Sequence, residues 1–434
     1  MNITNLIETK RDGGELSAAQ IEWFVRAYTA GDIPDYQAAA LTMAVYIRGM
    51  NRQETVALTL AMAHSGDMLD LHDVVPFTVD KHSSGGVGDK TTLVVQPLVA
   101  ACGLPVGKMS GRGLGSSGGT LDKMEAIRGW SSDLTLAQFR RQLAEIGLVL
   151  AGQTARLAPA DGKLYALRDV TGTVSSLPLI ASSIMSKKLA GGADAIVLDV
   201  KLGSGAFMPT VAAARALAEM MVGIGKDAGK KTTALLSDMN QPLGHAIGNA
   251  LEVREAIATL RGGGPVDFWS HCQEVAAHML LLGNRADTLD AAREMAAAAR
   301  ANGTGLAKFR QMVAAQGGDI HQVDSPDTLP QAAFIETVSA PREGYVAALD
   351  TGAIGWACVH LGGGRLQKGA TIDHSVGMVM PTKIGDWRQA GDPVCVIHAN
   401  AQDHLDAARQ AILAAITWSD TPVSPLPHFY GTVS

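Results

Sequence analysis

Two glycine-rich stretches of the chain carry side chains suited to binding an anion. The first, VDKHSSGGVGDKTT, covers residues 79–92. Its glycines allow tight turns that bring backbone N–H groups close to a ligand. Lys81 adds a positive charge, Ser83 adds a hydroxyl donor, and His82 between them is a candidate general acid. This composition predicts a cradle for an oxyanion.

The flanking residues indicate how this cradle is held. We expect residues 77–80 to end a strand and residues 91–102 to form a helix, whose N-terminus would favour an anion. A triphosphate-binding P-loop is the alternative, but its GxxxxGKS/T pattern has no acidic residue where Asp89 separates Gly88 from Lys90. Because Asp89 would repel a triphosphate, the pattern argues against a P-loop.

The second stretch, KMSGRGLGSSGGTLDKME, covers residues 108–125. It again joins a strand-like run, residues 106–109, to a helix, and again mixes glycines with hydroxyl side chains. Two such loops in one chain predict a phosphate that is held from both sides.

A further group of residues could bind a planar ligand with several acceptors. Ser183 and Lys187 lie four residues apart on an expected helix and therefore face the same side, and Arg168 precedes that helix. Their guanidinium, hydroxyl and ammonium groups suit a pyrimidine dione or its anion. A solvated helix end is the alternative. Phe207 follows a buried strand and could pack on a flat ring or in the core.

Hydrophobic periodicity predicts an all-helical beginning. Ser17 and Gln20 form a capping-box pattern, and Asn51 and Glu54 form another, so helices are expected throughout the first ~66 residues. The second of these helices carries apolar side chains on one side, namely Tyr36, Ala39, Ala40, Met43, Ala44 and Ile47.

From residue 74 the pattern changes to short apolar runs that alternate with helices, which is typical of an α/β sheet. Strands are expected at residues 77–80, 106–109, 148–151, 195–201 and 232–236. Helices are expected at residues 134–146, 211–224, 249–260, 268–282 and 288–301.

The fold class is therefore α/β with a separate all-helical lobe, a mixed sheet, a cleft between the lobes and a small C-terminal α+β subdomain. The helical domain is expected to comprise residues 1–66 and 159–190, the α/β domain residues 74–155 and 193–330, and the C-terminal subdomain residues 331–434. Residues 314–330 are expected to form a linker. In the subdomain we expect strands at 344–348, 370–376 and 394–398 and a helix at 403–416.

Composition excludes several function classes. At 434 residues and 47% hydrophobic content the chain can bury a large core, and its formal charge of −6 argues against nucleic acid as a partner. Four widely spaced cysteines show no CxxC pair, so neither a disulfide framework nor a structural zinc site is expected. The sequence has no signal-peptide core and no apolar run of the ~18 residues that a membrane span needs. A soluble cytoplasmic protein is expected.

Six motifs extend this reading to almost the whole chain, because they resemble, in order, those of the thymidine and pyrimidine-nucleoside phosphorylases. They are DKHSSGGVGDKTT, KMSGRGLG, GGTLDKME, GQTARLAPADGKLYALRD, DVKLGSGAFM and SDMNQPLGHAIGNALEVREA. The resemblance implies a pentosyltransferase that cleaves uridine, thymidine or deoxyuridine with inorganic phosphate, giving free base and (deoxy)ribose 1-phosphate. It also implies a homodimer in nucleoside salvage, with no redox cofactor and no catalytic divalent metal.

The resemblance assigns roles to individual positions of this chain. His82, Arg168 and Lys187 correspond to catalytic residues. The phosphate site would comprise Lys81, Ser83, Thr92, Ser110 and Thr120. The base site would comprise Arg168, Ser183 and Lys187, with apolar walls from Leu114, Val174, Ile180, Ile184 and Phe207.

The chain departs from the family pattern in one place and follows one of its branches in another. Ser116-Ser117 replaces the usual His-Thr, which alters a contact of that loop. Lys108 matches relatives that accept uridine as well as thymidine, so we expect it to contact substrate and favour a broad base range.

A third position concerns a monovalent cation, for which the resemblance implies a site at Gly88, Leu243, Ala246 and Glu255. Relatives usually have Thr where this chain has Lys90, and we expect the Lys90 ammonium to replace the ion by pairing with Glu255. Three alternatives to the broad-range enzyme stay open, namely a strict thymidine phosphorylase, an anthranilate-type phosphoribosyltransferase and a non-catalytic nucleoside-binding protein.

Overall fold

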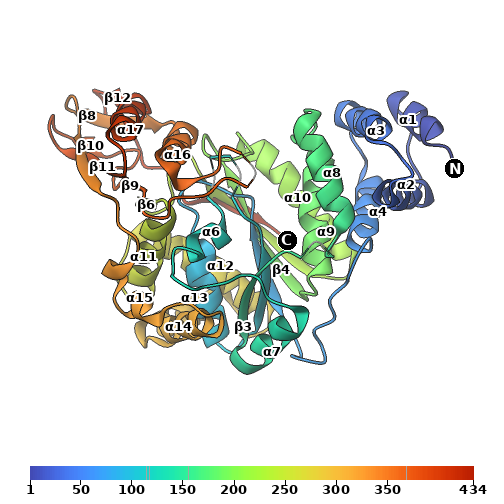
Figure 1. Cartoon of the computed structure of the whole chain (residues 1–434), viewed down its shortest axis with the longest axis horizontal. Coiled ribbons are helices and arrows are strands. Elements are labelled where there is room, and N and C mark those ends of the chain that lie inside the picture. The colour runs from blue at the N-terminus through green and yellow to red at the C-terminus, as the bar shows by residue number, and fades with distance from the viewer. Residues whose placement is uncertain (114, 117, 155, 368) are drawn as a thin grey trace.

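The computed structural model describes residues 1–113, 115–116, 118–154, 156–367 and 369–434. The N-terminal helices lie at one end of the molecule, the α/β lobe occupies the middle, and most of the C-terminal region lies at the opposite end (Figure 1). This arrangement confirms the predicted fold class of a helical bundle, a large α/β domain with a mixed sheet and a C-terminal α+β region.

The helical lobe is built from two segments of the chain. Its helices are α1 (Ile3–Arg11), α2 (Ala18–Ala30), α3 (Asp35–Arg48), α4 (Arg52–Ala63), α8 (Pro159–Val170) and α9 (Leu177–Ala190). Both predicted capping boxes are present, one at the start of α2 and one at the start of α4. Leu164 of α8 and Leu179 of α9 share one buried apolar cluster with α2 and α4. The return of the chain at α8 therefore completes this core.

Helix α3 is apolar on two faces. Its core contacts come from Ala38, Leu41 and Val45, which are buried. Of the apolar stripe noted in the sequence, Ala44 is buried, whereas Tyr36 and Ile47 are 75% and 69% exposed. Both stripes have helical spacing, and only packing against the other helices decides which of them is buried.

The central sheet has the order β1-β4-β5-β13. Its strands are β1 (Val79–Ser83), β4 (Ala195–Leu202), β5 (Lys231–Asp238) and β13 (Phe429–Val433). The first three are parallel, and β13 is antiparallel to β5, which makes the sheet mixed. Beside β1 lies the parallel pair β2 (Val106–Ser110) and β3 (Leu148–Gly152), and the Val79 N–H donates to the Pro105 carbonyl at 3.2 Å.

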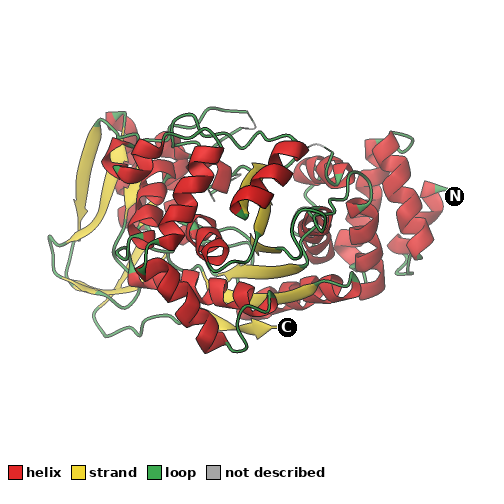
Figure 2. Ribbon diagram, turned by 90° about the horizontal axis from the view of Figure 1, so that it is seen from below, coloured by secondary structure: helices red, strands yellow, loops and turns green. Residues whose placement is uncertain are grey.

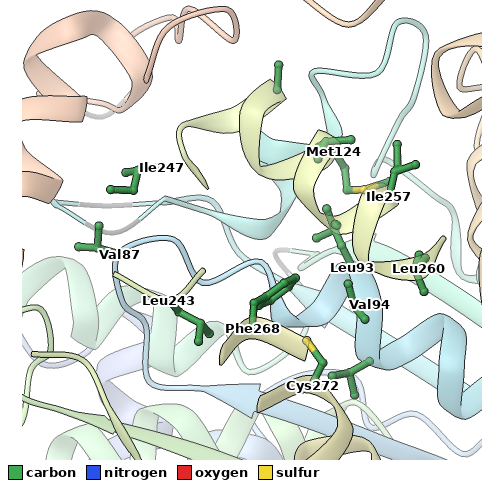
Figure 3. Packing of buried hydrophobic residues seen from close by; sticks show 14 of the residues in the cluster. Val87, Leu93, Val94, Met124, Leu243, Ile247, Ile257, Leu260, Phe268 and Cys272 are labelled. Carbon is green, nitrogen blue, oxygen red and sulfur yellow. The ribbon is translucent and has the colours of Figure 1, made fainter. Parts of the chain in front are cut away.

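Helices surround this sheet, as Figure 2 shows. They are α5 (Thr91–Ala101), α6 (Thr120–Met124), α7 (Leu136–Ile146), α10 (Val211–Asp227), α11 (Asn249–Leu260), α12 (Val266–Leu282), α13 (Leu289–Ala301), α14 (Thr304–Ala315) and α15 (Ile320–Asp324). The largest buried cluster joins α5, α6, α11 and α12 (Figure 3). Leu93 of α5 and Phe268 of α12 belong to it, so the helix that follows the first glycine stretch is fixed by core packing.

The first strand begins and ends later than expected. Residues 77–80 were predicted, but the parallel ladder pairs Val79 with Ala195 and continues to Ser83, opposite Asp199. The ladder extends because β4 is long and fully buried, a long-range contact that local sequence does not reveal. Lys81 and His82 consequently lie on a rigid strand.

Two predictions for the later chain were wrong. Residues 314–330 are no linker, since they include α15 and bury Val323 and Leu329. Residues 370–376 form no strand, and the strand β9 is Gly377–Val379. Asp373 accepts bonds from the Ser375 N–H and hydroxyl, a local turn that competes with a ladder.

The C-terminal region contains two small antiparallel sheets with the orders β6-β9-β11-β7 and β10-β8-β12. Their other strands are β6 (Ala246–Ile247), β7 (Phe334–Ser339), β8 (Gly344–Leu349), β10 (Trp387–Arg388), β11 (Pro393–Ala399) and β12 (Ile416–Ser419). Helices α16 (Thr351–Cys358) and α17 (Gln402–Ala414) cover them. The chain then returns to the central sheet as β13. Within the described residues, every helix is too short or too polar to cross a membrane.

Candidate functional site

The first glycine stretch connects the end of β1 to the start of α5. Gly88 has φ +72°, and a Cβ there would lie 2.8 Å from the Leu243 carbonyl oxygen, so only glycine fits without strain. Thr92 lies in the first turn of α5 and is buried. The predicted cradle is thus formed by a strand end, a tight turn and a helix N-terminus, which together favour an anion.

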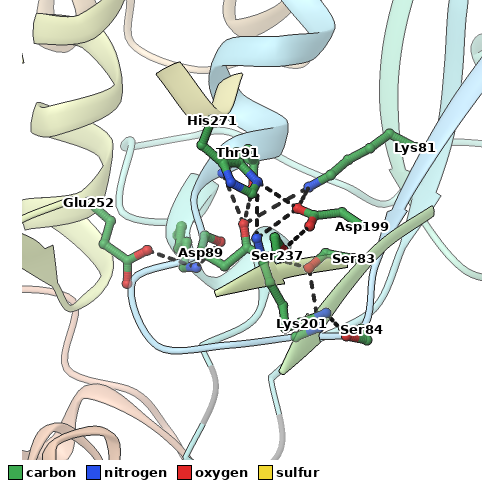
Figure 4. Close-up of polar contacts among 12 residues, drawn as sticks. Lys81, Ser83, Ser84, Asp89, Thr91, Asp199, Lys201, Ser237, Glu252 and His271 are labelled. Carbon is green, nitrogen blue, oxygen red and sulfur yellow. Dashed lines mark hydrogen bonds and ion pairs between the residues drawn. The ribbon is translucent and has the colours of Figure 1, made fainter. Parts of the chain in front are cut away.

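Lys81 is the best-placed cation in this cradle. Its side chain is 1% exposed, and Nζ lies 3.9 Å from both Asp89 Oδ1 and Asp199 Oδ2 (Figure 4). Those distances exceed a hydrogen bond, and Nζ has no hydrogen-bond partner in the described part of the chain. A buried ammonium without a partner is costly unless a ligand satisfies it. Lys81 is therefore suited to bind an anion.

Asp89 organises the hydroxyl groups around Lys81. The Ser83 and Thr91 hydroxyls both donate to its carboxylate. Burial would raise the pKa of Asp89, but the positive charges of Lys81, Lys201 and Lys123 outweigh burial and hold that pKa well below its usual range. In this structure the Ser83 hydroxyl proton is directed to Asp89, and its oxygen accepts the Gly85 N–H at 3.2 Å.

The second glycine stretch places Ser110 at the end of β2 and Thr120 at the start of α6. Gly119 packs so closely that a Cβ would lie 2.0 Å from the Gly113 nitrogen. Asp122 accepts the Gly113 N–H at 2.7 Å and thereby shapes the loop. Two residues named from the sequence, Leu114 and Ser117, lie outside the described residues.

Ser183 and Lys187 lie on one face of α9 as predicted. Lys187 Nζ donates to Asp161 Oδ2 at 2.6 Å and to Ser183 Oγ at 3.1 Å, and the lysine side chain remains 25% exposed. The carboxylate of Asp161, which the sequence analysis missed, thus orients the Lys187 ammonium. The only available signal was its position in the motif ADGKLYALRD.

Arg168 lies near this pair but is 3% exposed. Its guanidinium donates to the carbonyls of Thr173, Val174 and Leu179 at 3.3, 2.7 and 3.0 Å. Arg168 therefore holds the loop that precedes α9. Of the predicted apolar walls, Val174, Ile180 and Ile184 are half-buried, whereas Phe207 is 62% exposed.

His82 lies on β1 among several lysines. Burial and the charges of Lys188, Lys108 and Lys187 hold its pKa well below its usual value. The ring is therefore neutral at pH 7, and it can donate an N–H hydrogen bond without being a charged acid.

Asp80 and Lys188, both missed from the sequence, connect the two groups of site residues. Lys188 Nζ of α9 donates to Asp80 Oδ2 of β1 at 2.7 Å, and both side chains are buried. Lys108 lies on the other side of Asp80, 3.5 Å from Oδ1, and donates to the Lys81 carbonyl. Burial, only partly offset by Asp80, lowers the pKa of Lys108 to about 7.

Lys90 is completely buried at the start of α5. Its ammonium lies 2.5 Å from Glu255 Oε1 and donates to the carbonyls of Leu243 at 2.7 Å and Ala246 at 3.0 Å. The Phe268 ring centroid is 4.9 Å away. Lys90 Nζ thus contacts three of the four residues that were named for a cation, namely Leu243, Ala246 and Glu255.

Comparison with known proteins agrees with this geometry. Residues 4–66 match the family model of the glycosyl transferase helical bundle domain, residues 76–306 the glycosyl transferase a/b domain, and residues 345–419 the pyrimidine nucleoside phosphorylase C-terminal domain. The chain is 50% identical to a pyrimidine-nucleoside phosphorylase of Geobacillus stearothermophilus over 434 residues, all of both chains. The chain belongs to the pyrimidine-nucleoside phosphorylase family.

Other relatives agree with this membership. A pyrimidine-nucleoside phosphorylase of Staphylococcus aureus strain USA300 is 52% identical over 425 residues, 98% of each chain. The crystal structure of anthranilate phosphoribosyltransferase from Thermus thermophilus has a TM-score of 0.59 at 19% identity, covering 72% of this chain and 99% of that one. The latter likeness concerns the fold alone.

We predict that Lys187→Ala lowers kcat for base release by about 10²- to 10³-fold, the usual effect of removing one group that stabilises a developing anion. The variant also leaves the buried Asp161 carboxylate without its cation, so we expect some loss of thermal stability but a folded protein at the assay temperature. Steady-state kinetics and thermal melting of the purified variant measure both effects. Near-normal kcat in a folded variant would exclude the assigned role.

Proposed function

We infer that this protein catalyses reversible phosphorolysis of pyrimidine nucleosides to free base and (deoxy)ribose 1-phosphate. The observation that carries this inference is the Lys188–Asp80 ion pair. It joins α9, which presents Ser183 and Lys187, to β1, which presents Lys81 and His82. This connection supports a base site next to an anion site, as a reaction between a nucleoside and phosphate requires.

The chemistry follows from the charges in these two sites. A phosphate oxygen forms a bond to C1′ of the sugar while the C1′–N1 bond breaks, and its electron pair leaves with the base. Negative charge develops on the pyrimidine and positive charge on the sugar, as in glycoside cleavage. Lys187 would stabilise the leaving base, and Lys81 would hold the phosphate next to C1′.

The structure suggests different tasks for the other two predicted catalytic residues. The Arg168 guanidinium donates hydrogen bonds to backbone carbonyls. We therefore assign Arg168 to shaping the base site through Val174. His82 is neutral and would donate a hydrogen bond to a base oxygen as charge develops there. The proton that the departing base finally acquires would then come from solvent.

A broad substrate range is supported by Lys108. It is buried between Asp80 and the backbone carbonyl of Lys81, on the strand that carries the proposed anion site. A cation there can donate to a sugar hydroxyl, which favours uridine in addition to deoxynucleosides. The rival of a strict thymidine phosphorylase has no such donor. An anthranilate-type phosphoribosyltransferase would require magnesium and phosphoribosyl pyrophosphate.

We also propose that the Lys90 ammonium serves in place of a bound monovalent cation. It provides one positive charge to the Glu255 carboxylate, which also accepts the N–H groups of His245 and Ala246. A lysine tethered to α5 needs no ion from solution. Its pairing with Glu255 would hold the loop before α11 against the first glycine stretch.

The second apolar face of α3 supports a homodimer. Tyr36, Ala40, Met43 and Ile47 follow one another at helical spacing and are all exposed. An apolar stripe on the outside of a helix typically marks an interface, and a two-fold axis would place two α3 helices against each other. A cytoplasmic location fits the four cysteines, which are all free thiols.

The substrate range can be tested with uridine, thymidine, deoxyuridine and cytidine, with phosphate present and absent. We expect phosphate-dependent release of free base from the first three, without magnesium. We further expect the ratio of kcat/KM for uridine to that for deoxyuridine to fall about tenfold as pH rises through about 7, because Lys108 then loses its charge. Comparing two nucleosides at one pH cancels the titration of phosphate.

The matched control for this ratio is Lys108→Met, which should give a low ratio that is independent of pH. A wild-type ratio that stays constant across that range would exclude Lys108 from substrate recognition. Magnesium-dependent transfer of a phosphoribosyl group from phosphoribosyl pyrophosphate to an acceptor amine, with release of pyrophosphate, would instead support the transferase.

Replacement of the ion by Lys90 predicts that wild-type activity and melting temperature are the same in potassium chloride and tetramethylammonium chloride. Lys90→Thr leaves the Glu255 carboxylate without its cation, so it should lose stability, on the order of 3–5 kcal/mol, and regain part of it with potassium. Thermal melting at equal ionic strength measures this difference. A strong potassium requirement of the wild-type protein would contradict the proposal.

Dimerisation through α3 predicts that Ile47→Asp converts the protein to monomers, because a buried carboxylate in an apolar interface is costly. Light scattering after size exclusion gives the mass. Val266→Asp, at an exposed position on α12, serves as the control and should remain dimeric. A dimer that survives Ile47→Asp would place the interface elsewhere.

A further inference from the structure

The position of Lys81 raises a physical question. A buried ammonium 3.9 Å from two carboxylates would be expected to move onto one of them, because charge-assisted hydrogen bonds are strong in a low-dielectric interior. Lys81 instead lies between Asp89 and Asp199 without bonding to either of them. The N–H donors of Lys81 therefore stay available to a ligand. Other groups must bond to the two carboxylates so that neither captures Lys81.

The carboxylate of Asp199 already has three hydrogen-bonding neighbours. The Ser237 hydroxyl donates to Oδ1 at 2.5 Å, Lys201 Nζ donates to Oδ2 at 2.7 Å, and Nε2 of His271 lies 2.8 Å from Oδ2 (Figure 4). Asp89 is occupied in the same way by the Ser83 and Thr91 hydroxyls. Lys201 and His271 contact Oδ2, the Asp199 oxygen nearest Lys81, and Thr91 contacts Oδ1, the Asp89 oxygen nearest Lys81, so these three compete with Lys81 directly.

Rigid elements hold the donors around Asp199. Lys201 follows Asp199 by two residues on β4, so the two side chains share a face, and Ser237 lies opposite Lys201 in the register of β5. His271 comes from α12, and the Phe429 ring of β13 stacks on it at 5.0 Å between centroids. The last strand of the chain therefore packs against this cluster.

The Asp199 carboxylate remains charged. Burial would raise its pKa, but Lys201 and His271 outweigh burial and hold that pKa far below its usual range. Removal of Lys201 would leave this buried negative charge with only a hydroxyl and an imidazole at hydrogen-bond distance, and Lys81 would be the nearest remaining lysine ammonium. Such a charge would compete directly with phosphate for Lys81.

We propose that Lys201 is a positioning residue for phosphate binding: by pairing with Asp199 it prevents that carboxylate from capturing Lys81. The proposal rests on the function inferred above, in which Lys81 holds phosphate. In this proposal Lys201 does not contact phosphate. It acts on Asp199, and Asp199 in turn affects whether Lys81 is available. The same reasoning makes Ser237 a weaker member of the set, because it supplies one neutral donor to Asp199.

The test begins with Lys201→Met, which keeps the length of the side chain and removes its charge. We expect KM for phosphate to rise at least about tenfold, while KM for uridine changes less than about twofold. Isothermal titration with inorganic phosphate measures binding directly, so the result does not depend on residual activity.

The decisive variant is the double substitution Asp199→Asn with Lys201→Met. Asparagine removes the competing charge and keeps the shape, so phosphate affinity should recover most of what Lys201→Met lost. If Lys201 served only to stabilise the fold, the double variant would bind phosphate no better than the single one. That outcome would overturn the proposal.

Lys10→Met is the matched control for loss of a buried lysine. Lys10 is buried in the helical lobe with one carboxylate partner, Glu54, at 2.8 Å. The variant should lose stability and keep the wild-type KM for phosphate. Should Lys201→Met fail to fold, Ser237→Ala provides a milder test, with a two- to fivefold rise in KM for phosphate expected.

The outcomes separate this proposal from the proposed function. A wild-type protein that releases no base from any pyrimidine nucleoside would refute the function itself. An active wild type in which neither Lys201→Met nor Ser237→Ala changes phosphate binding would refute only the role of Lys201.

Discussion

The site depends on one constraint, which is that the Lys81 ammonium is buried without a hydrogen-bond partner among the described residues. Removing a charge from water without a partner costs several kcal/mol, so the surrounding structure must make this arrangement stable. Here the arrangement is held by a parallel ladder that fixes Lys81 on β1 and by two carboxylates that attract it from 3.9 Å. A phosphate that binds at this point would take the place of the water that the Lys81 ammonium lost on burial. The cost of burying Lys81 would then be offset when phosphate binds.

The position of α9 is the second requirement. Leu179 packs in the core of the helical lobe, whereas Met185 and Leu189 pack against β4 and α10 in the α/β lobe. The helix therefore belongs to both cores, and the Lys188–Asp80 pair ties it to β1. Because the proposed base site lies on α9 and the proposed phosphate site begins on β1, buried contacts rather than flexible loops set the distance between these two groups of residues.

Buried lysines of the α/β lobe are neutralised by carboxylates in internal ion pairs. Lys90 pairs with Glu255, Lys123 with Glu252 and Lys201 with Asp199, and each pair is almost completely buried. Each pair lies next to a glycine stretch or to the strand end that supports it. Such pairs add little net stability, but they fix orientation, since breaking one leaves an uncompensated charge. The lobe therefore holds a strongly charged site in a defined geometry.

The sequence by itself determined the fold class, the family and the types of residue in the site. Those depend on local chemistry, namely glycine turns, helix caps and the short motifs around Lys81, Arg168 and Lys187. It did not reveal Asp161, Lys188 or the donors around Asp199, nor which face of α3 is buried. Only the tertiary structure decided these features, because they depend on strand register and on helix packing between segments that lie far apart in the chain. No local pattern encodes which distant side chains share a carboxylate.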